Sequence, residues 1–256
     1  MYKKNMMREY IKSSELRVFN NRIKVRLSKE LAVKYDNGCY NNYLNNMDKC
    51  LQMIDTLNIQ YPSNAHPVFY VYIVPDDSYV ELLNVPTKFD KGNGGGKPVR
   101  CYDLDGFGSA YGLSQNMLEN KPSEETNISR IENEIHELAH IVHSQFFNKN
   151  QIICEGFAEA LPLYALGFEE IFDEHRNSIV NLNENQIFSA QEILNSEKNN
   201  SYGVESILPN RSCSFRLSYI SSYLFVRGCM ETIVKKYNLS KEQSVQYFLE
   251  IVKGSD

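Results

Sequence analysis

The segment from 127 to 147 constrains the fold more than any other part of this sequence. Its apolar residues recur at steps of three and four, which is the spacing of one face of an α-helix. Ser129 and Glu132 can form a capping box near its start. The periodic apolar residues are Ile128, Ile131, Ile135, Leu138, Ile141, Val142 and Phe146. The sequence therefore predicts a helix over about 127–147.

Strand patterns come mainly before this helix. Pro67–Pro75 is a β-branched and aromatic run between two prolines, which is typical of a central buried strand. Residues 16–27 read as a strand or hairpin around Asn20-Asn21, and apolar spacing predicts a helix over about 41–57. Later helices are predicted over 154–166, 189–196, 214–237 and 240–253. Strands followed by helices favour an α+β class over alternating α/β.

Length and composition limit the possible classes of protein. A chain of 256 residues with 42% hydrophobic residues folds as one large domain or two closely packed lobes. We expect a strand-bearing N-terminal lobe over about 1–122, a helical C-terminal lobe over about 123–256, and a cleft between them. The net charge of −5 argues against a nucleic-acid partner. The sequence gives no indication of oligomeric state.

The expected location is the cytoplasm. No stretch approaches the roughly 18–20 apolar residues that span a bilayer, and the N-terminus resembles no signal peptide, so we expect no membrane partner. The cysteines lie far apart and read as reduced and mostly buried. They are Cys39, Cys50, Cys101, Cys154, Cys213 and Cys229. A secreted protein whose signal peptide had been removed would show the same features.

Two glycine-rich segments precede the long helix. Lys91–Arg100 lacks the spacing of a phosphate-binding Walker loop and is expected to be a mobile loop. Gly106–Ser114 alternates glycine with larger residues, which suits a strand whose backbone is closely approached.

Residues 136–140 carry the strongest chemical signal, because His-Glu-Leu-Ala-His is an HExxH motif. Positions i and i+4 lie about 40° apart around a helix, so His136 and His140 can reach one metal ion with Glu137 beside them. Zinc is the expected ion, and Glu137 the expected general base. A polar helix face without metal and a metal site without catalysis are the alternatives.

The third ligand must come from elsewhere in the chain. In one branch of HExxH enzymes it is a histidine six residues after the second one, but that position is Phe146 here. The sequence from Glu155 to Glu159 is Glu-Gly-Phe-Ala-Glu. HELAH followed by EGFAE resembles the gluzincins, the metallopeptidases that include the thermolysin and aminopeptidase N families. The resemblance implies that Glu155 completes the zinc site and that Glu159 hydrogen-bonds a ligand histidine.

Some of these roles have alternatives. Glu159 is the substitute if Glu155 is not the ligand. His143, nearly eclipsing His136 along the helix, is expected in the core or hydrogen-bonded near the metal rather than as a ligand. The resemblance also implies that Tyr219 donates a proton to the oxyanion of the tetrahedral intermediate, with Tyr223 and Tyr202 as alternatives or with Tyr219 merely packed.

The resemblance further implies an edge strand, before the metal-binding helix, that pairs with the substrate backbone. Its place is taken by Gly108, Ser109, Ala110 and Tyr111. The expected protein is thus a compact zincin-like zinc metallopeptidase that acts on a peptide or protein substrate. A cytoplasmic HExxH peptidase that cleaves repressors is one alternative, and a zinc-stabilised binding or scaffold protein without turnover is another. Substrate specificity does not follow from the sequence.

Overall fold

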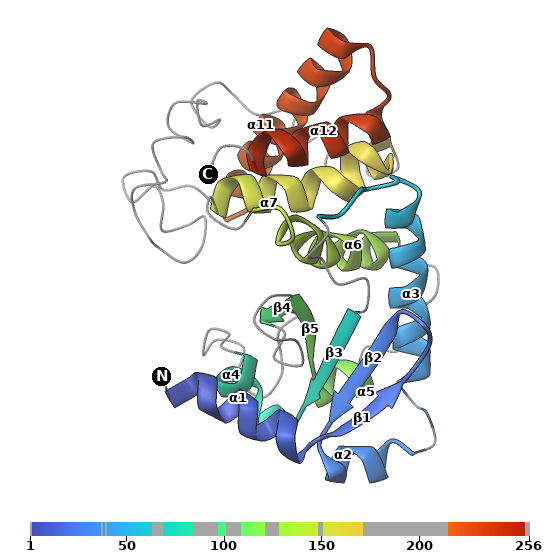
Figure 1. Ribbon diagram of the computed structural model, residues 1–256, viewed down its shortest axis with the longest axis vertical. Helices are drawn as coiled ribbons and strands as arrows, with labels where there is room; N and C mark the ends of the chain where they lie inside the picture. The colour runs from blue at the N-terminus through green and yellow to red at the C-terminus, as the bar shows by residue number, and fades with distance from the viewer. Residues whose placement is uncertain are drawn as a thin grey trace. The chain divides into compact units, whose positions relative to one another are not determined.

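The computed structural model describes residues 2–36, 38, 40–62, 69–83, 97–100, 109–120, 128–147, 151–170 and 215–253. They form helices and a sheet (Figure 1), which confirms the predicted α+β class. The chain divides into two compact units, Met1–Gln52 with Ser63–Ile141 and Met53–Pro62 with Val142–Asp256, whereas the sequence analysis placed one boundary near 122. Within the described ranges, no helix is long and apolar enough to cross a membrane.

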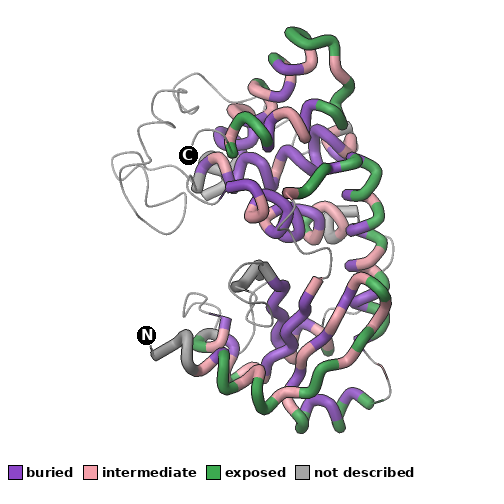
Figure 2. Tube along the Cα trace, in the orientation of Figure 1, coloured by how far each residue is buried: buried purple, intermediate pink, exposed green. Residues whose placement is uncertain are grey.

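The first unit is built on a five-stranded sheet with the strand order β1-β2-β3-β5-β4. Its strands are β1 Glu15–Val18, β2 Ile23–Leu27, β3 Phe69–Val74, β4 Lys97–Arg100 and β5 Ser109–Ser114. Strands β2, β3 and β5 run parallel, and β1 and β4 pair antiparallel at the two edges. β3 is central and buried while β1 is mostly exposed (Figure 2), so the predicted central strand is confirmed.

Helices cover the sheet. Those of the first unit are α1 Tyr2–Ser13, α2 Lys29–Lys34, α3 Asn41–Asp55, α4 Tyr79–Leu83, α5 Gln115–Asn120 and α6 Ile128–His143, with a 3-10 turn, η1, at Asp76–Ser78. On one face of the sheet, Met7 of α1 and Leu83 of α4 join a buried cluster with Tyr72 of β3 and Ala110 of β5. Side chains alternate along a strand, so Tyr111 points to the opposite face. There it hydrogen-bonds Tyr43 of α3.

Most predicted elements of this unit are confirmed. β1 and β2 form the hairpin expected over 16–27, and the Asn20 side chain accepts a hydrogen bond from the Ile23 N–H in its turn at 2.7 Å. α3 and α6 match the helices expected over 41–57 and 127–147. The loop predicted over Lys91–Arg100 was wrong for its last four residues, because residues 97–100 form strand β4. Pro98 is compatible with a strand there because an edge strand tolerates a missing N–H.

The second unit is helical. It contains α7 Gln151–Ala160, a π-helical turn η3 at Leu161–Ala165, a 3-10 turn η4 at Phe168–Glu170, α11 Phe215–Tyr237 and α12 Lys241–Lys253. Phe157 of α7 stacks on Phe248 of α12 with ring centroids 6.1 Å apart. Three of the four helices predicted after α6 are confirmed, although α7 begins a few residues before Cys154. The helix predicted over 189–196 lies outside the described residues.

Candidate metal centre

Helix α6 presents both histidines of the HExxH motif on one side. His136 and His140 are four residues apart, and their ring centroids lie 5.0 Å from each other with the ring planes at 85°. The two imidazoles lie about one helical turn apart and meet edge to face, because residues i and i+4 share one face of a helix. His136 is buried and His140 is half-buried. The helix thus places two candidate ligands close enough to share one ion.

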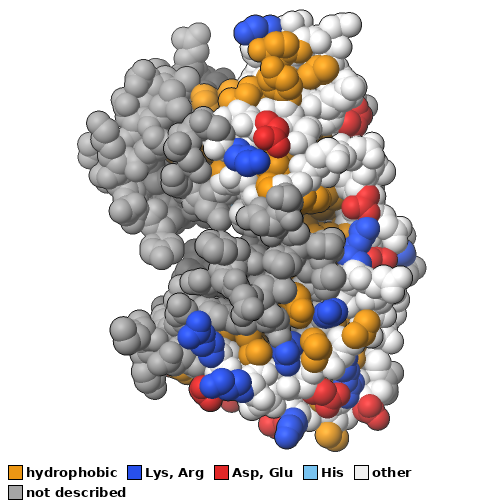
Figure 3. Space-filling view, viewed as in Figure 1, with side chains coloured by type: hydrophobic (Ala, Val, Ile, Leu, Met, Phe, Trp, Pro, Cys, Tyr) orange, Lys and Arg blue, Asp and Glu red, His pale blue; other side chains and the backbone are white. Residues whose placement is uncertain are grey.

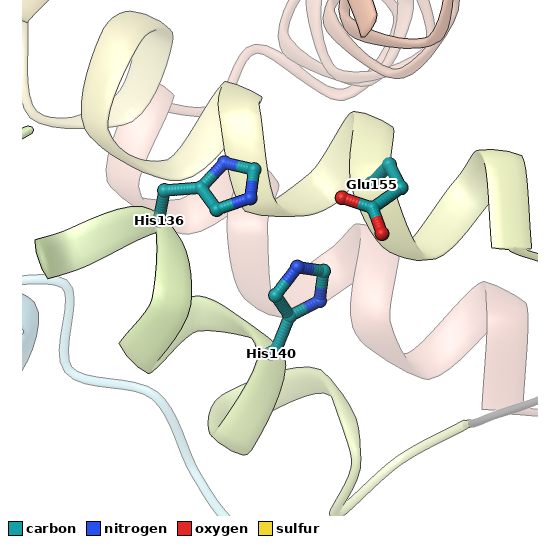
Figure 4. Close-up of side chains that lie close together, drawn as sticks. All are labelled: His136, His140 and Glu155. Atoms are coloured by element: carbon teal, nitrogen blue, oxygen red, sulfur yellow. The ribbon is translucent and has the colours of Figure 1, made fainter. Parts of the chain in front are cut away.

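Glu155 of α7 provides the third candidate ligand, as the sequence predicted. One potential ligand atom from each of His136, His140 and Glu155 lies within 4.8 Å of the other two. Figure 4 shows the two imidazoles on α6 and the carboxylate on α7 directed toward one another. Donors around a tetrahedral zinc lie about 3.3 Å apart, given bond lengths near 2.0–2.1 Å.

Gly156 explains how α7 holds Glu155 in place. A Cβ atom at this glycine would clash with the carbonyl oxygen of Ser222 and lie 2.7 Å from Cγ2 of Val226, both on α11. The two helices therefore approach each other more closely here than a larger residue allows. The residue next to the ligand is fixed against a neighbouring backbone, which limits the orientations that Glu155 can adopt.

Glu137 lies next to His136 on α6 and is only 7% exposed. Two tyrosine hydroxyls are influenced by its carboxylate. Burial, with a contribution from Glu137, raises the pKa of Tyr79 to about 12, and the pKa of the fully buried Tyr111 is also raised, first by burial and then by nearby groups including Glu137. Both phenols are therefore protonated at neutral pH. On the side of α6 that faces the sheet, the Glu137 carboxylate thus has buried, uncharged phenol groups near it.

Glu134 is a further polar residue on α6, and sequence reasoning missed it. Tyr43 of α3 donates a hydrogen bond to Glu134 Oε2 at 3.0 Å, and Tyr43 also hydrogen-bonds Tyr111. This chain of polar groups ties α6 to α3 and to β5. The available signal was the position of Glu134, which lies four residues before Leu138 and so falls within the apolar stripe of the helix.

His143 packs in the core of the second unit. Its Nδ1 lies 3.1 Å from the carbonyl oxygen of Phe147, and its ring stacks on Phe147 with centroids 5.0 Å apart. Its ring also meets Phe157 edge-on at 6.0 Å. The group of converging ligands does not include it. Of the two expected roles, core packing is therefore the one that these contacts support.

The structure places Glu159 and the three candidate tyrosines in different surroundings. Glu159 lies on α7, half-buried, and the converging carboxylate is that of Glu155 instead. Tyr219 lies on α11, but its side chain falls outside the described part, as does all of Tyr202. Tyr223 is buried, and its hydroxyl interacts with Glu169 and Arg227. Tyr223 thus belongs to a different polar cluster.

The predicted substrate strand needs a correction. Ser109, Ala110 and Tyr111 lie on β5, while Gly108 is outside the described residues. β5 is flanked by β3 on one side and by β4 on the other, so it is not an edge strand. Its main-chain groups are used by both neighbours. The strand at this edge of the sheet is β4, Lys97–Arg100.

Cys154 precedes Glu155 but does not behave as a reactive thiol. Burial raises its pKa to about 12, and the Glu155 carboxylate adds to the shift. A thiol in this state is protonated at neutral pH and is a poor nucleophile. Cys50, Cys154 and Cys229 are free cysteines, as expected for reduced thiols, and the other three lie outside the described ranges.

The donor set fits a zinc ion by its chemistry. Two imidazoles and one carboxylate are the protein ligands of many catalytic zinc sites, which keep a fourth position for water. His140 is the half-buried member of the three, and His136 and Glu155 are buried. No family model matches the chain, and no curated protein is significantly similar to it.

Proposed function

We propose that this protein is a zinc-dependent metallopeptidase with a zincin-like catalytic domain. His136, His140 and Glu155 would hold the metal, and Glu137 would be the general base. The observation that carries the proposal is the convergence of these three ligands beside a buried glutamate. The resemblance of HELAH and EGFAE to the gluzincin motifs supports the same assignment.

The chain's own residues would divide the reaction between them. A bound zinc ion would supply Lewis acidity, lowering the pKa of water toward about 7 and polarising the carbonyl oxygen of a peptide bond. Glu137 would accept the proton as water attacks the carbonyl carbon and would then deliver it to the nitrogen of the leaving amine. Its burial excludes bulk water from the carboxylate and strengthens the hydrogen bonds that it makes. Tyr219 would donate a hydrogen bond to the developing oxyanion, as the resemblance implies.

The substrate backbone would pair with β4. An edge strand offers main-chain donors and acceptors to an extended peptide, and β4 is the edge strand on the β5 side of the sheet. This assignment replaces the expected pairing with Gly108–Tyr111. It keeps the role that the resemblance implies and moves it to the neighbouring strand.

A quenched fluorescent peptide library would test the function with zinc-loaded protein. Glu137→Gln removes the base without removing a ligand, so the rate of cleavage should fall by about 1,000-fold while zinc content stays at the wild-type level. Glu132→Gln, the same substitution elsewhere on α6, is the matched control and should leave the rate within about twofold.

The outcomes separate the candidate functions. A Glu137→Gln variant that binds zinc and cleaves as fast as wild type would contradict the proposal. Zinc binding without cleavage of any library member would favour the scaffold alternative. Cleavage confined to a DNA-binding repressor would favour the repressor-cleaving alternative.

A further inference from the structure

Strand β1 leaves main-chain hydrogen-bonding groups at the other edge of the sheet. The Phe19 N–H donates to the Ile23 carbonyl oxygen at 3.0 Å, which marks a hydrogen-bonded pair in the β1–β2 ladder. Hydrogen-bonded and non-hydrogen-bonded pairs alternate along an antiparallel ladder. Leu16 and Val18 therefore direct their N–H and C=O groups away from β2. Among the described residues, no strand pairs with this edge.

The side chains of the same two residues are exposed. Leu16 is 43% exposed and Val18 is 67% exposed, so two large apolar residues lie exposed on the strand whose main-chain groups point outward. Arg26 and Lys24 of β2 lie directly opposite them in the ladder and therefore share their face of the sheet. Lys24 Nζ lies 5.7 Å from the centroid of the Tyr70 ring on β3. The β1 edge is thus an aliphatic strip beside a row of cations.

The charge around this edge differs in sign from that of the whole chain. Residues 1–36 contain ten Lys and Arg and four Asp and Glu, a net charge of +6 in a chain whose net charge is −5. The space-filling view shows Lys and Arg side chains beside exposed hydrophobic ones over this part of the first unit, with Asp and Glu side chains among them (Figure 3). Lys12 and Lys34 are 71% and 47% exposed, and they pair with Glu9 at 2.7 Å and with Glu119 at 2.6 Å. Such a surface attracts acidic partners.

Pairing with a second copy of the chain is disfavoured by this charge. In a two-fold arrangement that hydrogen-bonds Leu16 of one chain to Val18 of the other, the two Arg17 side chains would stand directly opposite each other. The two basic segments would also face one another. Like charges across such a pair are destabilising, whereas an acidic partner avoids both conflicts.

We infer that the β1 edge binds an extended, acidic segment of another protein by strand addition. The segment would hydrogen-bond to the outward main-chain groups of Leu16 and Val18 and place aliphatic side chains against theirs. Its acidic residues would face the positive field of residues 1–36. This surface is separate from β4 and from the candidate metal centre, so it would serve for partner or substrate-protein docking rather than for the chemical step.

Two short labelled peptides test the inference with the full-length protein. One alternates glutamate and valine between glycine ends, and the other alternates lysine and valine. In fluorescence anisotropy, the glutamate peptide should bind at least about tenfold more tightly than the lysine peptide. Val18→Asp should weaken its binding by about tenfold, because a carboxylate enters the aliphatic strip. Val33→Asp adds the same charge at an 80% exposed valine on α2 and should change binding by less than about twofold.

A backbone variant separates strand addition from charge alone. Val18→Pro removes an outward N–H but no hydrogen bond to β2, and it leaves the net charge unchanged. It should weaken the glutamate peptide about fivefold while circular dichroism and the melting temperature stay near wild type. Equal binding of the two peptides, equal effects of Val18→Asp and Val33→Asp, or a wild-type dimer that Val18→Asp dissociates would each overturn the inference.

Discussion

Two groups of polar side chains in this molecule differ in the source of their positive charge. In the metal group, two imidazoles and the Glu155 carboxylate converge within 4.8 Å of one another. In the second group, the Arg227 cluster, a guanidinium is ion-paired with Glu169 and, at 2.9 Å, with Glu231. The Arg227 guanidinium also lies 5.9 Å from the Tyr164 ring centroid and 6.0 Å from that of Tyr223.

The difference distinguishes a structural cluster from the binding site that we propose. Arg227 brings its own positive charge, and its carboxylate partners hold it between α11 and the turn η4. The chain itself therefore supplies both the cation and the carboxylates of this cluster. The metal group instead assembles lone pairs from α6 and α7, which is the donor set of a divalent cation. We therefore propose that the metal group, unlike the Arg227 cluster, takes its positive charge from solution as a bound cation.

Loss of a ligand should produce the largest effect. Glu155→Ala should lower zinc affinity by more than about 100-fold, since even residues that only support a ligand contribute 10- to 100-fold. Competition with a chromophoric chelator measures this affinity. Glu159→Ala, one turn further along α7, should lower zinc affinity by about tenfold at most, because the resemblance gives Glu159 only a supporting role. Equal losses in the two variants would show that Glu155 is not the specific ligand.

Gly156→Ala should cause the next largest effect, on folding stability. The added methyl meets the α11 backbone at Ser222, and overpacking of this kind costs about 3 kcal/mol of the free energy of unfolding. Gly228→Ala is the control, because a Cβ at that helical glycine has no neighbour within 4 Å. It should stabilise the protein by about 0.5–1 kcal/mol. Urea denaturation of both variants measures the contrast, which would fail if both changed stability alike.

Arg227→Met should be less costly and should leave the zinc site intact. Removing the guanidinium leaves the carboxylates of Glu169, which is 19% exposed, and Glu231 without this partner. We expect a loss of about 2 kcal/mol, between the values for buried and exposed pairs. Lys235→Met, at an exposed lysine of the same helix, should cost less than about 0.5 kcal/mol. A loss of zinc from Arg227→Met would show that the two groups are coupled.

Tyr43→Phe should have the smallest effect of the four. It removes the donor to Glu134 and the hydrogen bond with Tyr111 but keeps the packed ring, so the free energy of unfolding should fall by about 1 kcal/mol. Tyr61→Phe, at a 43% exposed tyrosine, should change stability by less than about 0.5 kcal/mol. Thermal unfolding of both variants decides whether the Glu134 hydrogen bond stabilises the chain, and equal melting temperatures would indicate that it does not.

Elements with a strong local pattern could be predicted from the sequence. α3 and α6 have regular apolar spacing, and β3 is a continuous β-branched and aromatic run. His136, Glu137 and His140 could be predicted from local sequence for the same reason, because an HExxH motif on a helix places its two histidines on one face. Glu155 followed from a resemblance in sequence, and the structure brings it to the two histidines.

Features that depend on distant partners could not be predicted in this way. β5 lies inside the sheet because it pairs with β4, for example through Val99 and Ala110. The sequence of β4 contains a proline, which is more typical of a loop than of a strand, so the strand was not predicted. Tyr43 and Glu134 are 91 residues apart, so neither local pattern contains their hydrogen bond. α1 was missed because its sequence is largely polar and its few apolar residues find their partners on the sheet.

The parallel order of β2, β3 and β5 has a consequence for synthesis on the ribosome. β3 begins at Phe69 and pairs with β2, but its other neighbour, β5, ends only at Ser114. Parallel strands so far apart in sequence pair slowly. A growing chain therefore carries the apolar residues of β3 with one side unpaired until β5 has left the exit tunnel. During that interval the nascent chain exposes an unpaired, apolar strand edge of the kind that promotes aggregation, and β5 covers that edge in the finished sheet.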